Sequence, residues 1–311
     1  MTYKLLSYQS STGPRAGMLV DDRIYDVAQE TDRTQWVSVL GILGEWEGGA
    51  AARLDAAADH IASGKSRSQN WARAETQLLA PLLYPGSIYC AGANYSDHRA
   101  EMAIALGVAP SPDMKELGES PWHFMKASRS SVVGPDAVVK LPAYSKTVDW
   151  EIELAVVIGK PGKDIPLDQA LDHVAGYTIA NDLSARDAMR RTKMPPTSPF
   201  HLDWIGHKCF DGACPLGPWI TPASQIADPH KLALKLWVAG ELMQDSNTDK
   251  LIFSIPEQIA MLSSRVTLHP GDVILTGTPA GCGAARKRFL QAGETVRLWI
   301  DGIGEFEHRI A

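Results

Sequence analysis

From about residue 79 onward, short apolar runs alternate with turns that contain glycine or proline. The clearest runs are SIYCAG, DAVVKLP, IELAVVIG, AGYTIAND, LALKLWVAG, DVILTG and TVRLWIDG. Runs of this length, rich in β-branched and aromatic residues and bounded by turn residues, predict strands. Helical patterns are fewer, at residues 96–106, 167–173 and 255–263. Since strands and helices do not alternate regularly, the pattern predicts a strand-rich α+β fold.

The first part of the chain has a different pattern of apolar and polar residues. Its pattern predicts two strand regions and then two helices, at residues 1–9, 16–28, 36–43 and 50–61. The pair Asp21-Asp22 marks a turn inside the second strand region. The polar segment SGKSRSQN, residues 63–70, is typical of a linker. We therefore expect a small N-terminal α+β domain at residues 1–75 and a larger domain at residues 76–311.

The composition of the 311 residues, 45% hydrophobic and 21% charged, is that of an ordinary globular protein. A net charge of −6 argues against a general nucleic-acid binder, which needs a basic surface. The segment MTYKLLSYQS lacks the apolar core of a signal peptide, and no run reaches the roughly 18 apolar residues of a membrane span. The cysteines are scattered without a CxxC pair, which predicts free thiols and no zinc site. We expect a cytoplasmic protein that binds neither nucleic acid nor membranes.

The segment DWEIEL, residues 149–154, places acids at every second position of a predicted strand. Alternation puts Asp149, Glu151 and Glu153 on one face. One interpretation is an edge strand with a solvated face. However, the strand continues into residues 155–158, which are apolar on both faces, and buried acids need a neutralising partner. Two carboxylates about 7 Å apart along a strand can share a hard cation.

Asp182 follows the predicted strand GYTIAN and is a candidate third ligand. It is equally suited to capping a helix, since Ser184 and Asp187 have the spacing of a capping box. Three carboxylates from two strands would suit Mg²⁺ or Mn²⁺.

A second set of candidates could carry the chemistry. His98 and Glu101 are three residues apart, so on a helix they face the same way and could activate a water molecule. The alternative is an exposed histidine and a glutamate that favours the helix N-terminus. Lys208 is either a surface charge or a group that stabilises an oxyanion. Thr278 follows the glycine of a strand-ending turn, LTGTP, and could bind a substrate carboxylate or serve the turn alone.

Several segments, taken together and in order, closely resemble the fumarylacetoacetate hydrolase family over residues 79–310. They are AGANYSDHRAEM, DWEIELAVVIGK, GYTIANDLSARD, GHKCFDGACPLGPWI, MQDSNTDKLIFSIPEQIAMLSS and LHPGDVILTGTPAGCG. The resemblance implies a mixed β-roll of stacked sheets, usually a homodimer. It also implies that Glu151, Glu153 and Asp182 bind Mg²⁺ or Mn²⁺. The first 75 residues resemble the small N-terminal domain of bacterial members only loosely.

The resemblance further assigns His98 and Glu101 to a water-activating pair on a mobile lid. Lys208 and Thr278 match groups that contact the substrate, and Tyr95, Gly277 and Arg186 are further candidate substrate contacts. One position departs from many small members, which carry glutamine where this chain has Met189. We expect residues 106–119 and 189–202 to select the substrate.

The favoured hypothesis is a hydrolase of C–C bonds in ketonic substrates. It would cleave an acylpyruvate-type 2-oxo acid, such as fumarylpyruvate, and release pyruvate through a metal-stabilised enolate. The alternatives are a decarboxylase of a 2-oxo diacid such as oxaloacetate, and an isomerase/decarboxylase of aromatic catabolism. A catalytically silent module that binds a metal and a small acid is a further alternative, although a buried cluster of acids is costly to retain without a function.

Overall fold

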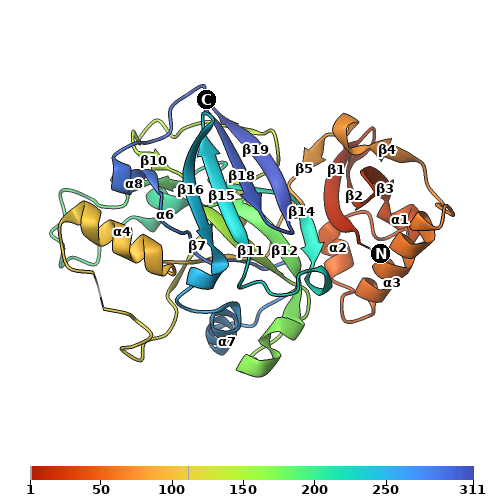
Figure 1. Cartoon of the computed structure of the whole chain (residues 1–311), viewed down its shortest axis with the longest axis horizontal. Coiled ribbons are helices and arrows are strands. Elements are labelled where there is room, and N and C mark those ends of the chain that lie inside the picture. The colour runs from red at the N-terminus through yellow and green to blue at the C-terminus, as the bar shows by residue number, and fades with distance from the viewer. Residues whose placement is uncertain (1, 111) are drawn as a thin grey trace.

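A long mixed β-sheet runs through the molecule in the computed structural model, which describes residues 2–110 and 112–311 (Figure 1). The N-terminal strands pair antiparallel: β1 (Lys4–Ser10), β2 (Gly13–Val20), β3 (Arg23–Asp26) and β4 (Asn70–Ala72). β1 also pairs with β14 (Cys214–Pro222) and so joins this part to the rest of the sheet. The sheet continues through β12 (Val174–Asn181), β11 (Ile152–Ile158), β17 (Val273–Leu275), β6 (Ile88–Ala91) and β7 (His123–Lys126). Two short strands flank it, β5 (Leu78–Leu79) on β1 and β8 (Val132–Val133) on β14.

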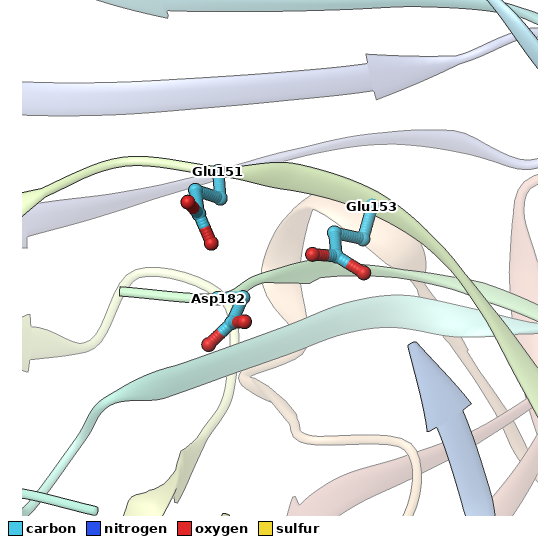
Figure 2. A group of neighbouring side chains, drawn as sticks. All are labelled: Glu151, Glu153 and Asp182. Atoms are coloured by element: carbon cyan, nitrogen blue, oxygen red, sulfur yellow. The ribbon is translucent and has the colours of Figure 1, made fainter. Parts of the chain in front are cut away.

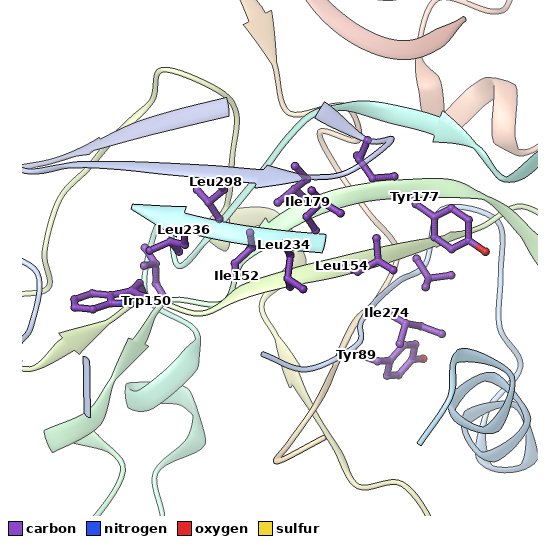
Figure 3. Packing of buried hydrophobic residues seen from close by; sticks show 14 of the residues in the cluster. Tyr89, Trp150, Ile152, Leu154, Tyr177, Ile179, Leu234, Leu236, Ile274 and Leu298 are labelled. Atoms are coloured by element: carbon purple, nitrogen blue, oxygen red, sulfur yellow. The ribbon is translucent and has the colours of Figure 1, made fainter. Parts of the chain in front are cut away.

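A second sheet lies across the first. Its order is β16 (Glu241–Asn247), β15 (Ala233–Val238), β18 (Thr295–Ile300), β19 (Gly304–Ile310) and β9 (Val138–Val139). Side chains from both sheets form one core between them, with Ile152, Leu154 and Ile179 meeting Leu234, Leu236 and Leu298 (Figure 3). A short pair, β10 (Val148–Asp149) with β13 (Ser184–Ala185), lies beside this core. The predicted strand-rich fold of stacked sheets is confirmed.

Strand β11 is buried on both faces because each face meets a different core. Its even-numbered residues face the second sheet, while Ala155 and Val157 pack into a cluster that includes side chains of β1, β2, α2 and α3. Glu151 and Glu153 precede these two residues on the odd-numbered side. The two acids therefore precede buried residues on the same face of the strand. This excludes the alternative of an edge strand with a solvated face. The sheet and this cluster both run across residue 75, and the division into residues 1–75 and 76–311 stays a prediction.

The helices pack around these sheets, with α2 and α3 against one face of the long sheet. They are α1 (Val27–Glu30), α2 (Val39–Leu43), α3 (Ala50–Ala62), α4 (Ser96–Leu106), α5 (Ser128–Ser131), α6 (Trp204–Lys208), α7 (Ile255–Arg265) and α8 (Gly283–Arg286). Short 3₁₀ turns lie at Arg73–Glu75, Leu167–His173, Arg186–Ala188, Ala223–Gln225 and Thr248–Lys250. The predicted helices at residues 50–61, 96–106 and 255–263 are confirmed, whereas residues 167–173 form 3₁₀ turns and residues 36–43 are helical only from Val39. In α7 a capping box of Ser254 and Glu257 fixes the start.

The polar segment 63–70 is tied to the N-terminal unit through one carboxylate. Glu30 is buried and accepts hydrogen bonds from the Arg67 and Ser68 amides and from the Ser66 and Ser68 hydroxyls. Burial by itself raises the pKa of Glu30, but these hydrogen bonds outweigh it and hold the pKa below its ordinary value. The segment is therefore fastened to α1 rather than a free linker.

This arrangement gives a pH-dependent expectation. Glu30→Gln should lower the free energy of unfolding by about 1–3 kcal/mol at about pH 7, because an amide cannot accept four donors. A lowered folded pKa stabilises the protein above the ordinary glutamate pKa, and this stabilisation disappears as the pH falls through the folded value. Urea unfolding of both proteins at several pH values measures the difference. A difference that does not shrink in acid would contradict the assignment.

Candidate metal centre and active site

Three buried carboxylates meet where β11 begins and β12 ends. Glu151 directly precedes β11, Glu153 lies within it, and Asp182 directly follows β12. The two strands are antiparallel, with Ile152 opposite Asn181, so these positions become neighbours. One oxygen from each carboxylate lies within 4.8 Å of the others (Figure 2). The side chain of Asp182 thus faces the cluster and caps no helix.

Asp149 does not join this cluster, contrary to the expectation that it shares the face of Glu151 and Glu153. The ladder of β11 starts only at Ile152, so the chain changes direction after β10. The Asp149 carboxylate instead accepts the Gly283 amide at 2.6 Å and the Ala284 amide at 3.0 Å. It also pairs with Arg186. Asp149 therefore anchors the start of α8.

Three cations neutralise most of the cluster. Lys208, in the last turn of α6, donates to Glu151 at 2.8 Å and to Asp182 at 2.7 Å. Lys126, at the end of β7, donates to Asp182 at 2.5 Å. Arg186 pairs with both Asp149 and Glu151. Nothing in the sequence pointed to Lys126, because its pattern predicts no strand at residues 123–126.

Glu153 is left with an uncompensated charge. Its described contact is the Gly277 amide, 2.6 Å from one carboxylate oxygen. Burial raises the pKa of Glu153, and the negative charges of Asp182 and Glu151 raise it further, to well above the ordinary value. The pKa of Glu151 moves the other way, because Arg186 and Lys208 outweigh the effect of its burial. A divalent cation at the centre would supply the missing charge, and three carboxylate oxygens are the donors that Mg²⁺ and Mn²⁺ prefer.

His98 and Glu101 lie beside the cluster on α4. Their side chains are 15% and 24% exposed, so neither is a free surface group. His98 Nδ1 lies 3.9 Å from Glu101 Oε2, longer than a hydrogen bond, and has no hydrogen-bond partner among the described residues. Glu101 also accepts the Gly281 amide at 2.7 Å. Burial raises the pKa of Glu101, but the neighbouring imidazole and this amide outweigh burial and hold the pKa below its ordinary value.

Asp97 fixes the start of α4, although it is not the cap of the helix. The N-cap is Tyr95, without a side-chain hydrogen bond. Asp97 accepts from Ser246 of β16, from Lys250 of the 3₁₀ turn that follows β16, and from the Ala280 amide. Glu101 and Asp97 therefore both hold α4 against the turn that follows β17.

A cavity of about 170 Å³ connects these groups. Its wall includes His98, Glu151, Glu153, Arg186, Lys208 and Thr278. Of the two segments expected to select the substrate, the described residues of 106–119 do not line it, whereas Met189 does. Residue 111 of the first segment lies outside the described residues.

Two candidate substrate contacts lie behind the cavity wall. The Tyr95 side chain is fully buried away from the cavity, and the Gly277 amide is bound to Glu153. The Thr278 hydroxyl donates to the Ile152 carbonyl and accepts from Gln244, so its proton is already committed. Gly277 and Thr278 therefore bond to the acidic strand, at Glu153 and Ile152.

Two buried amides, Asn181 and Gln244, hold the acidic strand in place. The Gln244 carbonyl oxygen accepts the Ile152 amide at 3.0 Å, and Asn181 accepts the Glu151 amide at 2.9 Å. Gln244 is anchored by donating to Thr278 and to the Pro279 carbonyl. The sequence offered no signal for Gln244, which lies in the polar run MQDSN of β16.

We expect Gln244→Met, which keeps the shape but removes the amide, to weaken divalent-metal affinity about 10- to 100-fold. The released Ile152 amide lets the strand between the two glutamates shift. Calorimetric titration with Mn²⁺ measures the effect. Ser7→Ala is a matched control, since it removes a buried hydrogen bond to Pro81 far from the cluster and should lower only thermal stability. Unchanged Mn²⁺ affinity in Gln244→Met would refute the positioning role.

Stacked mixed sheets around a cavity with a carboxylate cluster and a His–Glu pair define an enzyme of the fumarylacetoacetate hydrolase class. Residues 87–311 match the family model described as fumarylacetoacetate (FAA) hydrolase C-terminal. The chain belongs to the fumarylacetoacetate hydrolase family, as its sequence suggested.

Relatives in this family differ in reaction. The mitochondrial oxaloacetate tautomerase of Xenopus laevis is 43% identical over 240 residues, which cover 76% of this chain and 69% of the relative. A putative HpcE protein from Mycobacterium smegmatis has a similar structure, with a TM-score of 0.79, 33% identity and 99% of each chain covered. Maleylpyruvate hydrolase from Sphingobium sp. SYK-6, solved with manganese(II) and pyruvate, has a TM-score of 0.73 and 29% identity, covering 99% of this chain and 98% of its own.

Other expectations are partly tested. All four cysteines are unpaired, as predicted. No helix among the described residues has the length and apolar character to cross a membrane. The Xenopus laevis relative is named as mitochondrial, so the cytoplasm remains a prediction for this chain.

Proposed function

We propose that this chain is a divalent-metal-dependent hydrolase that cleaves acylpyruvate-type 2-oxo acids and releases pyruvate. The observation that carries the proposal is the placement of His98, with Glu101 behind it, in the same cavity as Glu151 and Glu153. A decarboxylase or a tautomerase has no need for a group that activates water. The solved neighbour that cleaves maleylpyruvate, with manganese and pyruvate in its structure, supports this reading.

When bound by Glu151, Glu153 and Asp182, a Mg²⁺ or Mn²⁺ ion would supply positive charge that stabilises an enolate. His98 removes a proton from water through Nε2, while Glu101 favours the tautomer with its proton on Nδ1. Hydroxide attacks the carbonyl carbon distal to the carboxylate. The C–C bond then breaks, its electrons leave with pyruvate as the enolate, and a carboxylic acid remains.

Lys208 and Arg186 are the positively charged side chains among the described residues that line the cavity, and Lys208 can stabilise the enolate. Burial lowers the pKa of Lys208, but Asp182 and Glu151 outweigh it and raise the pKa, so the ammonium stays charged. A charged ammonium beside the developing enolate lowers the barrier most when water is excluded. The enolate finally takes up a proton and leaves as pyruvate.

A second candidate is favoured by a specific finding. The relatives at 43% identity are named oxaloacetate tautomerases. Such a reaction, or decarboxylation of a 2-oxo diacid, would use the same carboxylate cluster to stabilise an enolate. The same holds for an isomerase/decarboxylase of aromatic catabolism. His98 would then have no water to activate.

The product distinguishes these reactions. Purified protein is incubated with 2,4-dioxopentanoate or with oxaloacetate, with Mg²⁺ or with excess chelator, and followed by proton NMR. We expect pyruvate and acetate from the first substrate, only with metal. Turnover of oxaloacetate without cleavage of the dioxo acid would replace the hydrolase by the second candidate. Turnover of neither would favour the silent module.

We also propose that the protein is a cytoplasmic homodimer, as the family resemblance implies. Light scattering on a sizing column measures the mass directly. A mass equal to one chain of 33.8 kDa would contradict the dimer.

A further inference from the structure

Strand β7 and the residue before it run along the site. Trp122 directly precedes β7, while Phe124 and Lys126 lie within it, so strand alternation puts these three side chains on one face. Trp122 is 48% exposed, Phe124 is half-buried, and Lys126 is 3% exposed and bound to Asp182. Trp122 and Phe124 both line the cavity. This face is thus aromatic at its exposed end and charged where it meets the carboxylates.

A third aromatic ring completes this wall. Trp204 of α6 lies with its ring centre 5.1 Å from that of Trp122 and 5.3 Å from that of Phe124, stacked on the latter. These separations are those of favourable aromatic pairs. Trp204 also lines the cavity. We name Trp122, Phe124 and Trp204 the aromatic wall.

The aromatic wall is built into the fold rather than an accident of exposed rings. A side chain at Gly92 would place its Cβ 2.3 Å from the Trp122 ring, so the ring can lie there only because residue 92 is glycine. The Gly92 amide also donates to the Trp122 carbonyl at 3.1 Å. The backbone hydrogen bond and the packing against Gly92 therefore hold Trp122 in place, although its side chain is nearly half exposed.

The cations of the cavity lie at its carboxylate end. Among the described residues that line it, the lysines and arginines are Lys208 and Arg186. Lys208 binds Glu151 and Asp182, and Arg186 binds Asp149 and Glu151. Met189 adds an apolar surface. Lys208 Nζ lies over the Phe124 ring, 4.7 Å from its centre, so the rings away from the cations are those of Trp122 and Trp204. A second carboxylate at that end of the substrate would meet no arginine or lysine among the described residues that line the cavity.

We propose that the distal group of the substrate is apolar, an aryl or bulky alkyl group that packs on the aromatic wall. The favoured substrates are then 4-aryl or 4-alkyl 2,4-dioxo acids with a single carboxylate, rather than the dicarboxylates. This inference rests on the proposed function for the reaction, and it adds only which distal group the cavity binds.

The test compares three substrates with the Mg²⁺-loaded protein. They are 2,4-dioxo-4-phenylbutanoate, 2,4-dioxopentanoate and fumarylpyruvate, whose distal groups are phenyl, methyl and carboxylate-bearing. We expect kcat/KM for the phenyl compound to exceed that for each of the others about 10- to 100-fold. A higher kcat/KM for fumarylpyruvate would overturn the proposal.

Two variants test whether Trp122 causes the preference for the phenyl compound. Trp122→Ala should remove about tenfold from kcat/KM for the phenyl compound and change the methyl compound less than about threefold, because only the larger group reaches the wall. Trp71→Ala, at a half-exposed tryptophan of β4, is the matched control and should change neither. Equal losses for both substrates in Trp122→Ala would contradict a specificity role.

If no dioxo acid is cleaved, the proposed function fails, but the preference for an apolar distal group can still be tested. Calorimetry then compares binding of phenylpyruvate, whose distal group is apolar, with binding of oxaloacetate, whose distal group is a carboxylate. Tighter binding of phenylpyruvate, weakened in Trp122→Ala, supports the aromatic wall whatever the reaction. Tighter binding of oxaloacetate overturns it.

Discussion

Glu153→Gln will abolish measurable Mn²⁺ affinity and lower kcat for acylpyruvate cleavage by about a thousandfold or more, the scale of losing a large electrostatic contribution. Glu153 is the carboxylate of the cluster without a cationic partner among the described residues, so it has the most to gain from a divalent ion. The same substitution will not destabilise the metal-free protein. Burial and the neighbouring acids disfavour the charged form of Glu153 and raise its pKa, and glutamine is a neutral group of the same shape.

Glu151→Gln is the matched comparison. Glu151 accepts from Lys208 and Arg186, so its loss should lower the free energy of unfolding of metal-free protein by about 1–3 kcal/mol. Mn²⁺ calorimetry and thermal unfolding in chelator give both readouts for both variants. The account is wrong if Glu153→Gln retains wild-type Mn²⁺ affinity. It is also wrong if the two variants are equally destabilised in chelator.

His98→Ala will lower the rate of acylpyruvate hydrolysis by about 10²- to 10⁴-fold, the usual contribution of a general base. Mn²⁺ affinity will stay within about twofold of wild type, because His98 is no member of the carboxylate cluster. Glu101→Gln should have a smaller effect, about 10- to 100-fold, since it orients the imidazole without touching the water.

Steady-state kinetics with 2,4-dioxopentanoate measure these losses. His60→Ala, on α3 and remote from the cavity, is the control and should be fully active. If His98→Ala loses hydrolysis but still enolises oxaloacetate, the imidazole acts on water as described. Full hydrolytic activity in His98→Ala would remove it as the base.

Local patterns predicted most of the fold. Apolar runs bounded by glycine and proline located β6, β11, β12, β15 and β18, because such runs have few other stable conformations. The acids at 151 and 153 stood out because the strand that follows them is apolar on both faces. What the local pattern could not show is that β10 ends before Glu151. The interruption depends on Asn181 and Gln244, which lie far away in the sequence.

The residues of the site that stand in recognisable local segments could be predicted from the sequence, and the others could not. The family resemblance, not spacing, brought in Asp182, His98 and Lys208. Lys126, Gln244 and the aromatic wall come from β7, β16 and α6, whose side chains converge only after the sheets stack. Their sequence signals are ordinary for a strand or a short helix. Sheet register and stacking, which single-sequence periodicity does not encode, decide these contacts.

The most direct test of the central claim is a crystal structure with Mn²⁺ and oxalate, measured for anomalous scattering. We expect a manganese peak about 2.0–2.2 Å from oxygens of Glu151, Glu153 and Asp182. We also expect that Lys208 no longer bridges Glu151 and Asp182 as it does at 2.8 and 2.7 Å here. A structure without a peak at these carboxylates, with the Lys208 bridge intact at saturating Mn²⁺, would contradict the account.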